Sequence, residues 1–419
     1  MKIAILGGSG VATPQLADEL GRRLGPDLTV CLIGRNHEKL HIVAAAVARR
    51  CPDLRVVAAE SVAAGVSGAD LVLNQVRVGG LEGRAWDEKA PTEFGMIGEE
   101  TVGAGGFALG YRTLPVVRAL AREVAGLAPD AWFVNLTNPA GLVLSALAAE
   151  TSLRALAVCD IPVSMTAAIG KVLPGADLRF FGTNHASAVI AARDQGGRDR
   201  LAELVTGEHG GGAGSGPAQE WAQLAGVIAN PYLRYYHDPS LRPAAPVAQS
   251  RADELLALQG RMLDSYRAGD AAGADAALAE RNPHWYAEVV APVIAALLGH
   301  GEPHRFVVQV ANNGLVPFLR PSAAVEVTAE VGPDGVRPLP IPAVPAELKV
   351  LTLQLTEADE LIRKASLAAD PQLAVRALAL NPLVPDAESA RGFWKVFADR
   401  WPDAASGPQR GGDPGQERT

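Results

Sequence analysis

A cysteine and an aspartate stand side by side where an apolar run ends. Cys159 and Asp160 follow residues 155–158 and precede Pro162. A thiol next to a carboxylate at the end of a strand has two interpretations. The cysteine can be inert packing and the aspartate a helix N-cap, which is a common use of aspartate. Alternatively, the thiolate binds a metal ion and the carboxylate is an acid beside it. The pair alone leaves both open.

A glycine-rich turn follows the first apolar run of the chain. It contains Gly7, Gly8, Ser9 and Gly10 and precedes a helical pattern. Glycine lets a backbone approach a pyrophosphate, which then rests on the helix N-terminus. The full pattern G-x-G-x-x-G is incomplete, since its third glycine position holds Thr13 or nothing. We expect these four residues to bind a dinucleotide, and an ordinary tight turn is the alternative.

An arginine, rather than an acidic residue, follows the second apolar run. An acidic residue there would bind the adenine ribose of NAD, whereas Arg35 can stack on adenine or contact a 2′-phosphate. Arg35 is therefore a second candidate cofactor contact, with a solvated arginine as the alternative. The cofactor is expected to be NAD, and NADP stays open.

These residues need a sheet to position them. The short apolar runs predict strands at residues 2–6, 28–34, 54–59, 69–76, 131–138, 155–160 and 178–186. Helical patterns lie between most of them, which predicts a Rossmann-type, doubly wound parallel sheet and an α/β fold.

The second half of the chain has a different pattern. Residues 250–300 read as helices, and residues 304–314 and 323–331 read as strands. We expect a second, α+β lobe rather than more of the same sheet. The predicted division is a dinucleotide-binding domain at 1–186 and a substrate-binding, catalytic domain at 187–405. Residues 206–219 are expected to form a surface loop and residues 406–419 a disordered tail.

Composition excludes several classes of partner. The 419 residues are 48% hydrophobic and 20% charged, and the net charge of -8 gives no electrostatic case for nucleic acid. No apolar run reaches the ~18 residues that span a bilayer, and the first residues lack the pattern of a signal peptide. Three scattered cysteines do not make a disulfide framework. We expect a cytoplasmic protein without a membrane or nucleic-acid partner.

Several longer stretches carry a resemblance to a known family. They are NQVRVGGLEGRAWDEKAPTEFGMIGEETVGAGGF (74–107), VNLTNPAGLV (134–143), YLRYYHDP (232–239), VCDIP, GTNHA and VANNGLVP. Together they resemble the family 4 glycoside hydrolases, enzymes that depend on NAD and a divalent metal and mostly act on sugar 6-phosphates. The resemblance runs from residue 1 to about 397. It implies a lactate/malate dehydrogenase-like fold, and a homodimer or homotetramer.

The family's route is oxidation and elimination rather than two-carboxylate hydrolysis. The cofactor takes hydride from the sugar's C3, a base removes the C2 proton, the C1–O bond breaks, water adds and the hydride returns. The metal polarises the oxygens on C2 and C3.

The resemblance assigns two metal ligands and an acid. Cys159 matches the family's cysteine ligand and His185, in GTNHA, its histidine ligand. A sulfur and an imidazole nitrogen suit Mn²⁺ or another divalent transition metal. Asp160 matches the acid that protonates the leaving group in some members, and a helix cap is the alternative.

The base lies in a stretch that departs from the family. Tyr286 aligns with the tyrosine that takes the C2 proton, usually preceded by R-G-G-x-x. Here residues 281–287 read Arg-Asn-Pro-His-Trp-Tyr-Ala, and proline restricts a backbone that paired glycines leave free. A core aromatic is the alternative for Tyr286, and His284 is the alternative base.

Three further residues are assigned by resemblance. Arg84 matches the arginine that holds substrate at the phosphate, and Asn138 the asparagine that contacts sugar hydroxyls. Asn74 is expected to contact the cofactor. The alternative for Arg84 is an ion pair with Asp87 or Glu88 on one helix face.

The expected activity is hydrolysis of 6-phospho-glucosides, first of all by a 6-phospho-β-glucosidase. Residues 232–239 and the NNGLVP motif favour the β branch, whereas Asp160 favours the α branch. Two other functions stay open. One is an NAD(P)-dependent 2-hydroxy acid dehydrogenase. The other is a catalytically silent sugar-phosphate-binding relative, suggested by the altered residues 282–284.

Overall fold

The computed structural model describes residues 1–206, 216–280, 285–301 and 303–406. Most of the expected loop at 206–219 and nearly all of the expected tail at 406–419 lie outside these ranges, as does His284. Within the described residues, no helix combines the length and apolarity that crossing a bilayer requires.

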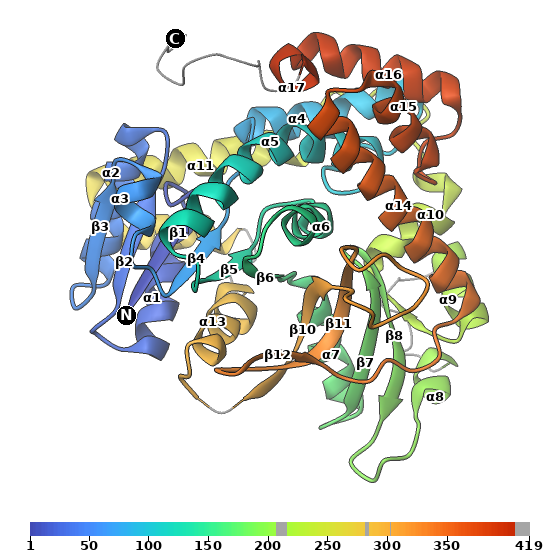
Figure 1. Ribbon diagram of the computed structural model, residues 1–419, viewed down its shortest axis with the longest axis horizontal. Helices are drawn as coiled ribbons and strands as arrows, with labels where there is room; N and C mark the ends of the chain where they lie inside the picture. Colours follow the sequence, from blue (N-terminus) through green and yellow to red (C-terminus); the bar gives the residue numbers. More distant parts are fainter. Residues whose placement is uncertain (207–215, 281–284, 302, 407–419) are drawn as a thin grey trace.

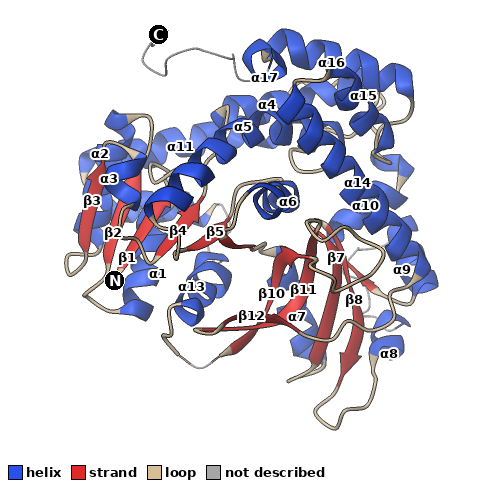
Figure 2. Cartoon of the chain, in the orientation of Figure 1, coloured by secondary structure: helices blue, strands red, loops and turns tan. Residues whose placement is uncertain are grey.

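Six parallel strands form the first part of the large sheet (Figure 2). They are β1 (Lys2–Leu6), β2 (Thr29–Ile33), β3 (Arg55–Ala59), β4 (Leu71–Asn74), β5 (Trp132–Asn135) and β6 (Arg154–Ala157). Their spatial order is β3-β2-β1-β4-β5-β6, and each neighbouring pair is parallel. The order reverses beside β1, where open α/β sheets bind ligands. The predicted doubly wound sheet is confirmed.

The same sheet continues with three strands from the second half of the chain. They are β10 (His304–Ala311), β11 (Ala324–Gly332) and β12 (Gly335–Pro338). They run antiparallel, and Gln309 of β10 pairs with Ala157 of β6. The expectation that these strands form part of a separate sheet is therefore wrong. The open edge of β6 needed a partner, which apolar patterns alone cannot identify.

A second, three-stranded sheet stands beside it (Figure 2). It consists of β7 (Asp177–Thr183), β8 (Ala186–Arg193) and β9 (Ile228–Ala229), in antiparallel pairs. The predicted strand at 178–186 is thus β7 and a turn that leads into β8, outside the parallel sheet. The turn contains His185, which has a φ of 61°.

Helices cover both sheets (Figure 1). They are α1 (Thr13–Leu24), α2 (His37–Arg50), α3 (Val62–Val66), α4 (Gly80–Lys89), α5 (Gly103–Leu127), α6 (Ala140–Glu150), α7 (Ile161–Val172), α8 (Leu201–Thr206), α9 (Pro217–Ala225), α10 (Arg234–His237), α11 (Arg251–Ala268), α12 (Ala271–Ala279), α13 (Ala291–Leu297), α14 (Ala346–Ala368), α15 (Pro371–Leu380), α16 (Ala387–Arg400) and α17 (Pro402–Ser406). Short turns are η1 (Ala90–Phe94), η2 (Pro231–Leu233), η3 (Pro239–Leu241) and the π-helical η4 (Tyr286–Val290).

The core lies on both faces of the large sheet. Ile3 and Ile5 of β1 pack into one apolar cluster, together with residues of α1, α11 and α13. Ala4 and Leu6 pack into another, with residues of α3, α5 and α6. Alternate side chains of a strand point to opposite faces, so a strand buried on both sides reads as a continuous apolar run.

A buried ion pair joins α4 to α5. Both terminal nitrogens of the Arg112 guanidinium donate to the Asp87 carboxylate, over 2.6 and 2.5 Å. The two side chains are 1% and 0% exposed, and Arg112 Nε also donates to the Val78 carbonyl. A bidentate pair without water fixes one geometry of the two helices. This pair therefore positions α4, which carries Arg84.

We expect Arg112→Met to lower the free energy of unfolding by about 3–5 kcal/mol, because it leaves the Asp87 charge buried without a partner. Urea unfolding of the variant measures the effect. Arg112→Met combined with Asp87→Leu should recover much of the loss, since it removes both charges. Arg122→Met, at an exposed position of the same helix, is the control. A single variant as stable as this control would contradict the argument.

Candidate active site

The candidate residues of the first half gather at one edge of the large sheet. The strand register pairs Leu6 with Asn74, Asn74 with Asn135, and Asn135 with Ala157. The glycine turn follows Leu6 directly, and Cys159 lies two residues beyond Ala157. Parallel strands end at the same edge, so the expected cofactor loop and the expected metal ligand share it.

The glycine turn fits tightly between the ends of β2 and β4. Gly7 has a φ of 80°, and a Cβ there would lie 2.8 Å from the Gln75 carbonyl oxygen. A Cβ on Gly8 would lie 2.8 Å from the Leu32 Cα. Both contacts are with backbone, so neither position accepts a side chain. The two glycines bring the chain close to the sheet edge just before α1 begins.

The remaining residues of the turn have different surroundings. A Cβ on Gly10 would meet only ordinary contacts, and one on Gly34 would lie 3.0 Å from Ser9 Oγ. Thr13, at the third position of the glycine pattern, is buried and accepts a hydrogen bond from Gln75 Nε2 over 3.1 Å. Thr13 is thus part of the packing of α1 rather than of an open turn.

The other two candidate cofactor contacts lie at strand ends. Arg35 is exposed just after β2. Asn74 is 0% exposed, and its Nδ2 donates to Asn135 Oδ1 over 2.8 Å. Among the described residues, Asn74 Oδ1 has no hydrogen-bond partner. A buried amide oxygen without a partner is costly, so it is a candidate acceptor for a ligand hydroxyl or amide.

Cys159 and Asp160 face each other at the start of α7. Cys159 is buried, and its Sγ lies 3.7 Å from Asp160 Oδ1. Asp160 occupies the N-cap position, but its side chain makes no cap hydrogen bond. The helix-cap interpretation therefore lacks its defining contact. Burial raises the pKa of the Cys159 thiol well above its usual value, with Glu326 and Asp160 adding to the rise. A cation would be needed to stabilise the thiolate there.

His185 is held in an unusual backbone conformation. Its φ of 61° lies in the left-handed region, which non-glycine residues seldom adopt. The imidazole stacks on the Tyr232 ring, with centroids 4.1 Å apart and planes at 11°. Burial lowers the pKa of His185 to about 4, so the ring is neutral at neutral pH. A neutral, fixed imidazole is the form that binds metal ions.

A threonine connects the histidine to a carboxylate. Thr101 Oγ1 lies 2.9 Å from His185 Nδ1 and 2.6 Å from Glu99 Oε2. A hydroxyl that donates to the carboxylate accepts from the Nδ1–H of the imidazole. That arrangement leaves the lone pair on Nε2 for a metal ion. Burial raises the pKa of Glu99 to about 7, although the hydrogen bonds from Thr101 oppose the rise.

Two arginines and two more carboxylates form the next layer. Arg84 Nε donates to Glu88 Oε1 over 2.6 Å, and an Arg84 terminal nitrogen lies 2.7 Å from Glu100 Oε1. Arg77 also contacts the Glu100 carboxylate. Burial alone would raise the pKa of Glu100, but Arg77 and Arg84 hold it below its usual value. The expected alternative for Arg84, an ion pair with Glu88, is present, whereas Asp87 pairs with Arg112 instead.

Electrostatic contacts bring most of these residues together. Asp160 interacts with both Cys159 and His185, and Glu100 interacts with His185. Arg84 is therefore linked through Glu100 to the pair of candidate metal ligands. The four predicted residues Arg84, Cys159, Asp160 and His185 belong to one cluster.

Tyr286 and Asn138 are held by other contacts. Tyr286 is buried on η4, which packs against α1, and its ring lies 4.8 Å from that of Trp285. Burial raises the pKa of Tyr266, and the nearby Tyr286 adds to that rise. The Tyr266 hydroxyl in turn donates to the carbonyl of Val11, which follows the glycine turn. Tyr286 thus lies on the side of the glycine turn. Asn138 is half-buried after β5.

The residues that the sequence analysis missed lie within stretches that it quoted. Thr101, Glu99, Glu100 and Arg77 belong to residues 74–107, and Tyr232 to residues 232–239. The sequence feature that could have identified the residues of the first stretch is the polar run Glu99-Glu100-Thr101, which lies between Gly98 and Gly103. Only the fold reveals that this run meets His185, which comes from a distant hairpin.

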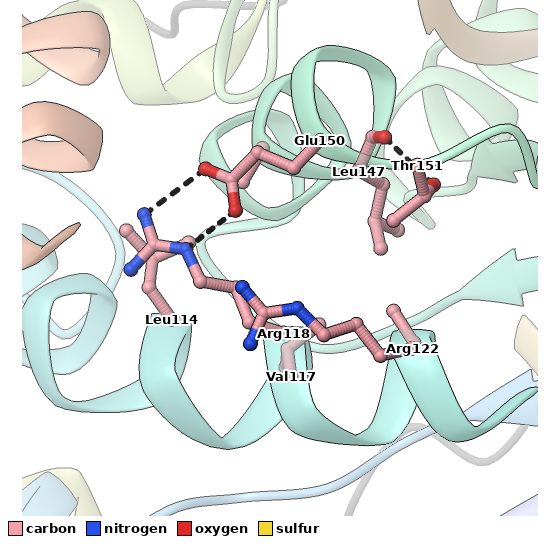
Figure 3. Close-up of a pocket in the computed structure, with 9 residues that line it drawn as sticks. Leu114, Val117, Arg118, Arg122, Leu147, Glu150 and Thr151 are labelled. Atoms are coloured by element: carbon pink, nitrogen blue, oxygen red, sulfur yellow. Dashed lines mark hydrogen bonds and ion pairs between the residues drawn. The ribbon is translucent and has the colours of Figure 1, made fainter. Parts of the chain in front are cut away.

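One cavity of ≈ 50 Å³ adjoins the cluster and is lined in part by Thr101, Asn184 and Asp359. It has room for a few water molecules. Another pocket lies between α5 and α6, where Arg118 Nε donates to Glu150 Oε2 over 2.7 Å (Figure 3). None of the predicted site residues lines that pocket.

The donor set fits a metal ion with open positions. Across the described ranges, no group of three or more histidine, cysteine or acidic side chains is arranged to hold a metal. Cys159 and His185 offer one sulfur and one nitrogen, which leaves positions for water or substrate oxygens, as catalytic metal sites require. A resident ion here would bind through two side chains and exchangeable oxygens.

Comparison with known proteins identifies the family. The family model described as "Family 4 glycosyl hydrolase" matches residues 2–174, and that of the "Family 4 glycosyl hydrolase C-terminal domain" matches residues 180–384. The chain belongs to the family 4 glycosyl hydrolases. The membership suggested by the sequence motifs is confirmed.

Several relatives of this family 4 chain match more than nine tenths of its length. A "Probable 6-phospho-beta-glucosidase" of Bacillus subtilis is 27% identical over 415 residues, which cover 92% of each chain. The structure of a 6-phospho-β-glucosidase from Thermotoga maritima, with manganese, NAD⁺ and glucose-6-phosphate, has a TM-score of 0.85 at 26% identity and covers 96% of this chain and 98% of its own. A 6-phospho-α-glucosidase from gut microorganisms, with NAD and Mn²⁺, has a TM-score of 0.83 at 26% identity, with the same coverage.

A dehydrogenase shares the fold. Malate dehydrogenase from Plasmodium falciparum has a TM-score of 0.51 at 14% identity and covers 87% of this chain and 98% of its own. The expected dehydrogenase-like architecture is thus confirmed at the level of the fold.

We expect Cys159→Ser to weaken binding of Co²⁺ sharply and to abolish the thiolate-to-cobalt charge-transfer band, because oxygen replaces the sulfur donor. Absorption titration of the purified protein with Co²⁺ measures both. Cys51→Ser is the matched control, since Cys51 is also a free, buried cysteine. A Cys159→Ser protein that keeps the band would show that the cysteine is not a ligand.

Proposed function

We propose that this family 4 glycosyl hydrolase cleaves 6-phospho-glucosides, first of all as a 6-phospho-β-glucosidase, with NAD and a divalent transition metal such as Mn²⁺ as cofactors. The observation that carries the proposal is the placement of Cys159 and His185 in one buried cluster at the sheet edge that also carries the glycine turn. The names and ligands of the relatives support the substrate class and both cofactors.

The proposed chemistry divides between the cofactors and the chain. Bound NAD supplies a hydride acceptor for the sugar's C3, and a bound divalent ion supplies positive charge at the oxygens on C2 and C3. Gly7, Gly8, Ser9 and Gly10 of the turn, with Arg35 and Asn74, hold the dinucleotide. Cys159 and His185 hold the ion.

The substrate contacts follow from charge and position. Arg84 binds the 6-phosphate with a guanidinium that Glu88 and Glu100 orient, and Asn138 contacts sugar hydroxyls. Asp160 protonates the leaving oxygen at C1, a role that its freedom from helix capping supports. Tyr286 takes the C2 proton. A phenol with an ordinary pKa of ~10 needs nearby positive charge to serve as a base near neutral pH.

The α anomer is the alternative substrate, favoured by Asp160 and by the 6-phospho-α-glucosidase among the relatives. A 2-hydroxy acid dehydrogenase would have no use for a cysteine–histidine pair.

We further propose a cytoplasmic homodimer or homotetramer, as the family resemblance implies, and light scattering of the purified protein measures the assembly.

A panel of p-nitrophenyl glucosides tests the activity. The α and β compounds, each with and without the 6-phosphate, are assayed with NAD⁺, Mn²⁺ and a reductant. We expect turnover of the phosphorylated β compound above all others, and its loss in excess EDTA. Inactivity on all four compounds would overturn the proposal. Full activity in the chelator would overturn the metal requirement alone.

We expect Arg84→Ala to raise KM for the phosphorylated substrate by roughly 10- to 100-fold, because a charge-assisted hydrogen bond contributes about 1.5–3 kcal/mol. Steady-state kinetics on phosphorylated and unphosphorylated substrates measure the difference. Glu82→Ala, at an exposed position of the same helix, is the control. If Arg84→Ala raised KM equally for both substrates, the role of Arg84 would be structural, through its ion pairs with Glu88 and Glu100.

We expect Tyr286→Phe to lower turnover by ~10²–10⁴, because the ring and its packing remain while the proton acceptor is lost. In D₂O the native enzyme should exchange the C2 hydrogen of the sugar, as NMR of the product would detect, and the variant should not.

Two further variants sharpen this test. Tyr111→Phe, which also removes a buried hydroxyl, should keep its turnover, since Tyr111 donates to the Ala365 carbonyl away from the cluster. Near-native turnover of Tyr286→Phe beside an inactive His284→Ala would transfer the role to the histidine. Hydrolysis by the native enzyme without deuterium at C2 would reject the elimination route.

A further inference from the structure

A carboxylate with no assigned role lies buried behind the candidate metal ligands. Glu326 of β11 is 1% exposed. Its Oε2 accepts a hydrogen bond from Ser187 Oγ over 2.5 Å, and its Oε1 accepts one from Gln309 Nε2 over 3.2 Å. Ser187 and Gln309 are 0% and 1% exposed, so the three side chains form a network without bulk water. Such networks specify one arrangement, because every broken bond leaves a buried polar group unpaired.

Each of the two hydrogen bonds leads to the segment of one candidate ligand. Gln309 is the residue of β10 that pairs with Ala157 of β6, two residues before Cys159. Ser187 lies on β8, two residues after His185. Glu326 therefore connects the segment that carries the sulfur donor with the segment that carries the nitrogen donor, although the two belong to different sheets.

A further arm reaches the ring that supports the histidine. Asn230, which is 0% exposed, donates from its backbone nitrogen to the Ser187 carbonyl over 3.0 Å. Its Oδ1 accepts a hydrogen bond from the Tyr232 nitrogen over 3.0 Å, and the Tyr232 ring stacks on His185. The network thus constrains His185 both along its own strand and through the stacked ring.

Proximity to the ligands is also visible in the electrostatics. Burial dominates the rise of the Cys159 pKa, and the charges of Glu326 and Asp160 both add to it. The Glu326 carboxylate reaches the two candidate ligand segments through its hydrogen bonds with Gln309 and Ser187, as expected for a group that acts through the backbone on either side.

We propose that Glu326 is a positioning residue that sets the separation of Cys159 and His185 and thereby the affinity of the site for a divalent ion. The inference rests on the proposed metal site, and it adds a residue outside the ligand set. A purely structural role for Glu326 would lower stability and leave metal affinity unchanged.

Variants at Glu326 separate the two roles. Glu326→Gln keeps an acceptor oxygen for Gln309 but replaces the oxygen that accepts from Ser187 with an amide donor, so the Ser187 hydroxyl must turn. Glu326→Ala removes both bonds. Because partners outside the ligand set typically contribute 10- to 100-fold in metal affinity, we expect Co²⁺ to bind about tenfold more weakly to Glu326→Ala, and less weakly to Glu326→Gln. Glu326→Gln also keeps the test decisive if Glu326→Ala fails to fold.

A residue on the same strand provides the matched control. Thr328 is buried two positions further along β11, where its hydroxyl donates to the Leu178 carbonyl and accepts from the Phe180 nitrogen. These bonds join β11 to β7 and involve neither Ser187 nor Gln309, the two partners of Glu326. Thr328→Val should therefore lower the melting temperature while leaving Co²⁺ affinity and the charge-transfer band unchanged.

The experiment is a Co²⁺ titration of the full-length native protein and the three variants, followed by absorption and accompanied by melting curves. Weaker Co²⁺ binding in the Glu326 variants, with the native affinity retained in Thr328→Val, supports the inference. Native Co²⁺ affinity in both Glu326 variants, or an equal loss in Thr328→Val, overturns it and leaves the proposed function intact. Absence of Co²⁺ binding by the native protein overturns the proposed metal site and this inference together.

Discussion

The candidate site depends on a single junction between two parts of the chain. β6 ends the parallel half of the large sheet, and Gln309 of β10 pairs with Ala157 at that edge. The next strand, β11, is bonded to β7 of the hairpin that carries His185, and Glu326 of β11 hydrogen-bonds to Ser187 of that hairpin and to Gln309 of β10. Under the proposed function, a shift at the junction would separate the sulfur of Cys159 from the imidazole of His185.

Burial determines the protonation states of the groups around this junction. A neutral His185 and a protonated Cys159 follow from removal of water, as the direction of both pKa shifts indicates. Glu100 stays ionised because Arg77 and Arg84 lie against it. Under the proposed function, the cluster is preorganised to receive a cation at Cys159 and His185 and a phosphate at Arg84, with little rearrangement of the chain.

Sequence patterns predicted what is local. The apolar runs and the glycine turn located the parallel strands, and the motif resemblance selected Cys159, His185 and Arg84, which the fold brings into one cluster. These patterns did not predict which strands pair when they are far apart in the sequence. Nothing in residues 304–331 indicates that β10 completes the edge of β6, and a one-strand interpretation of residues 178–186 hid the turn that sets His185 at a φ of 61°. The contact between Thr101 and His185 was missed for the same reason, because the two residues are 84 positions apart in the sequence and meet only in the fold.

The central claim is that Cys159 and His185 hold one divalent ion together. X-ray absorption at the zinc edge of the Zn²⁺-loaded protein tests it most directly. The account predicts one sulfur scatterer at about 2.3 Å and imidazole nitrogen and oxygen scatterers at about 2.0–2.1 Å, with the sulfur lost in Cys159→Ser. A native spectrum that contains only nitrogen and oxygen neighbours, or several sulfurs, would contradict it.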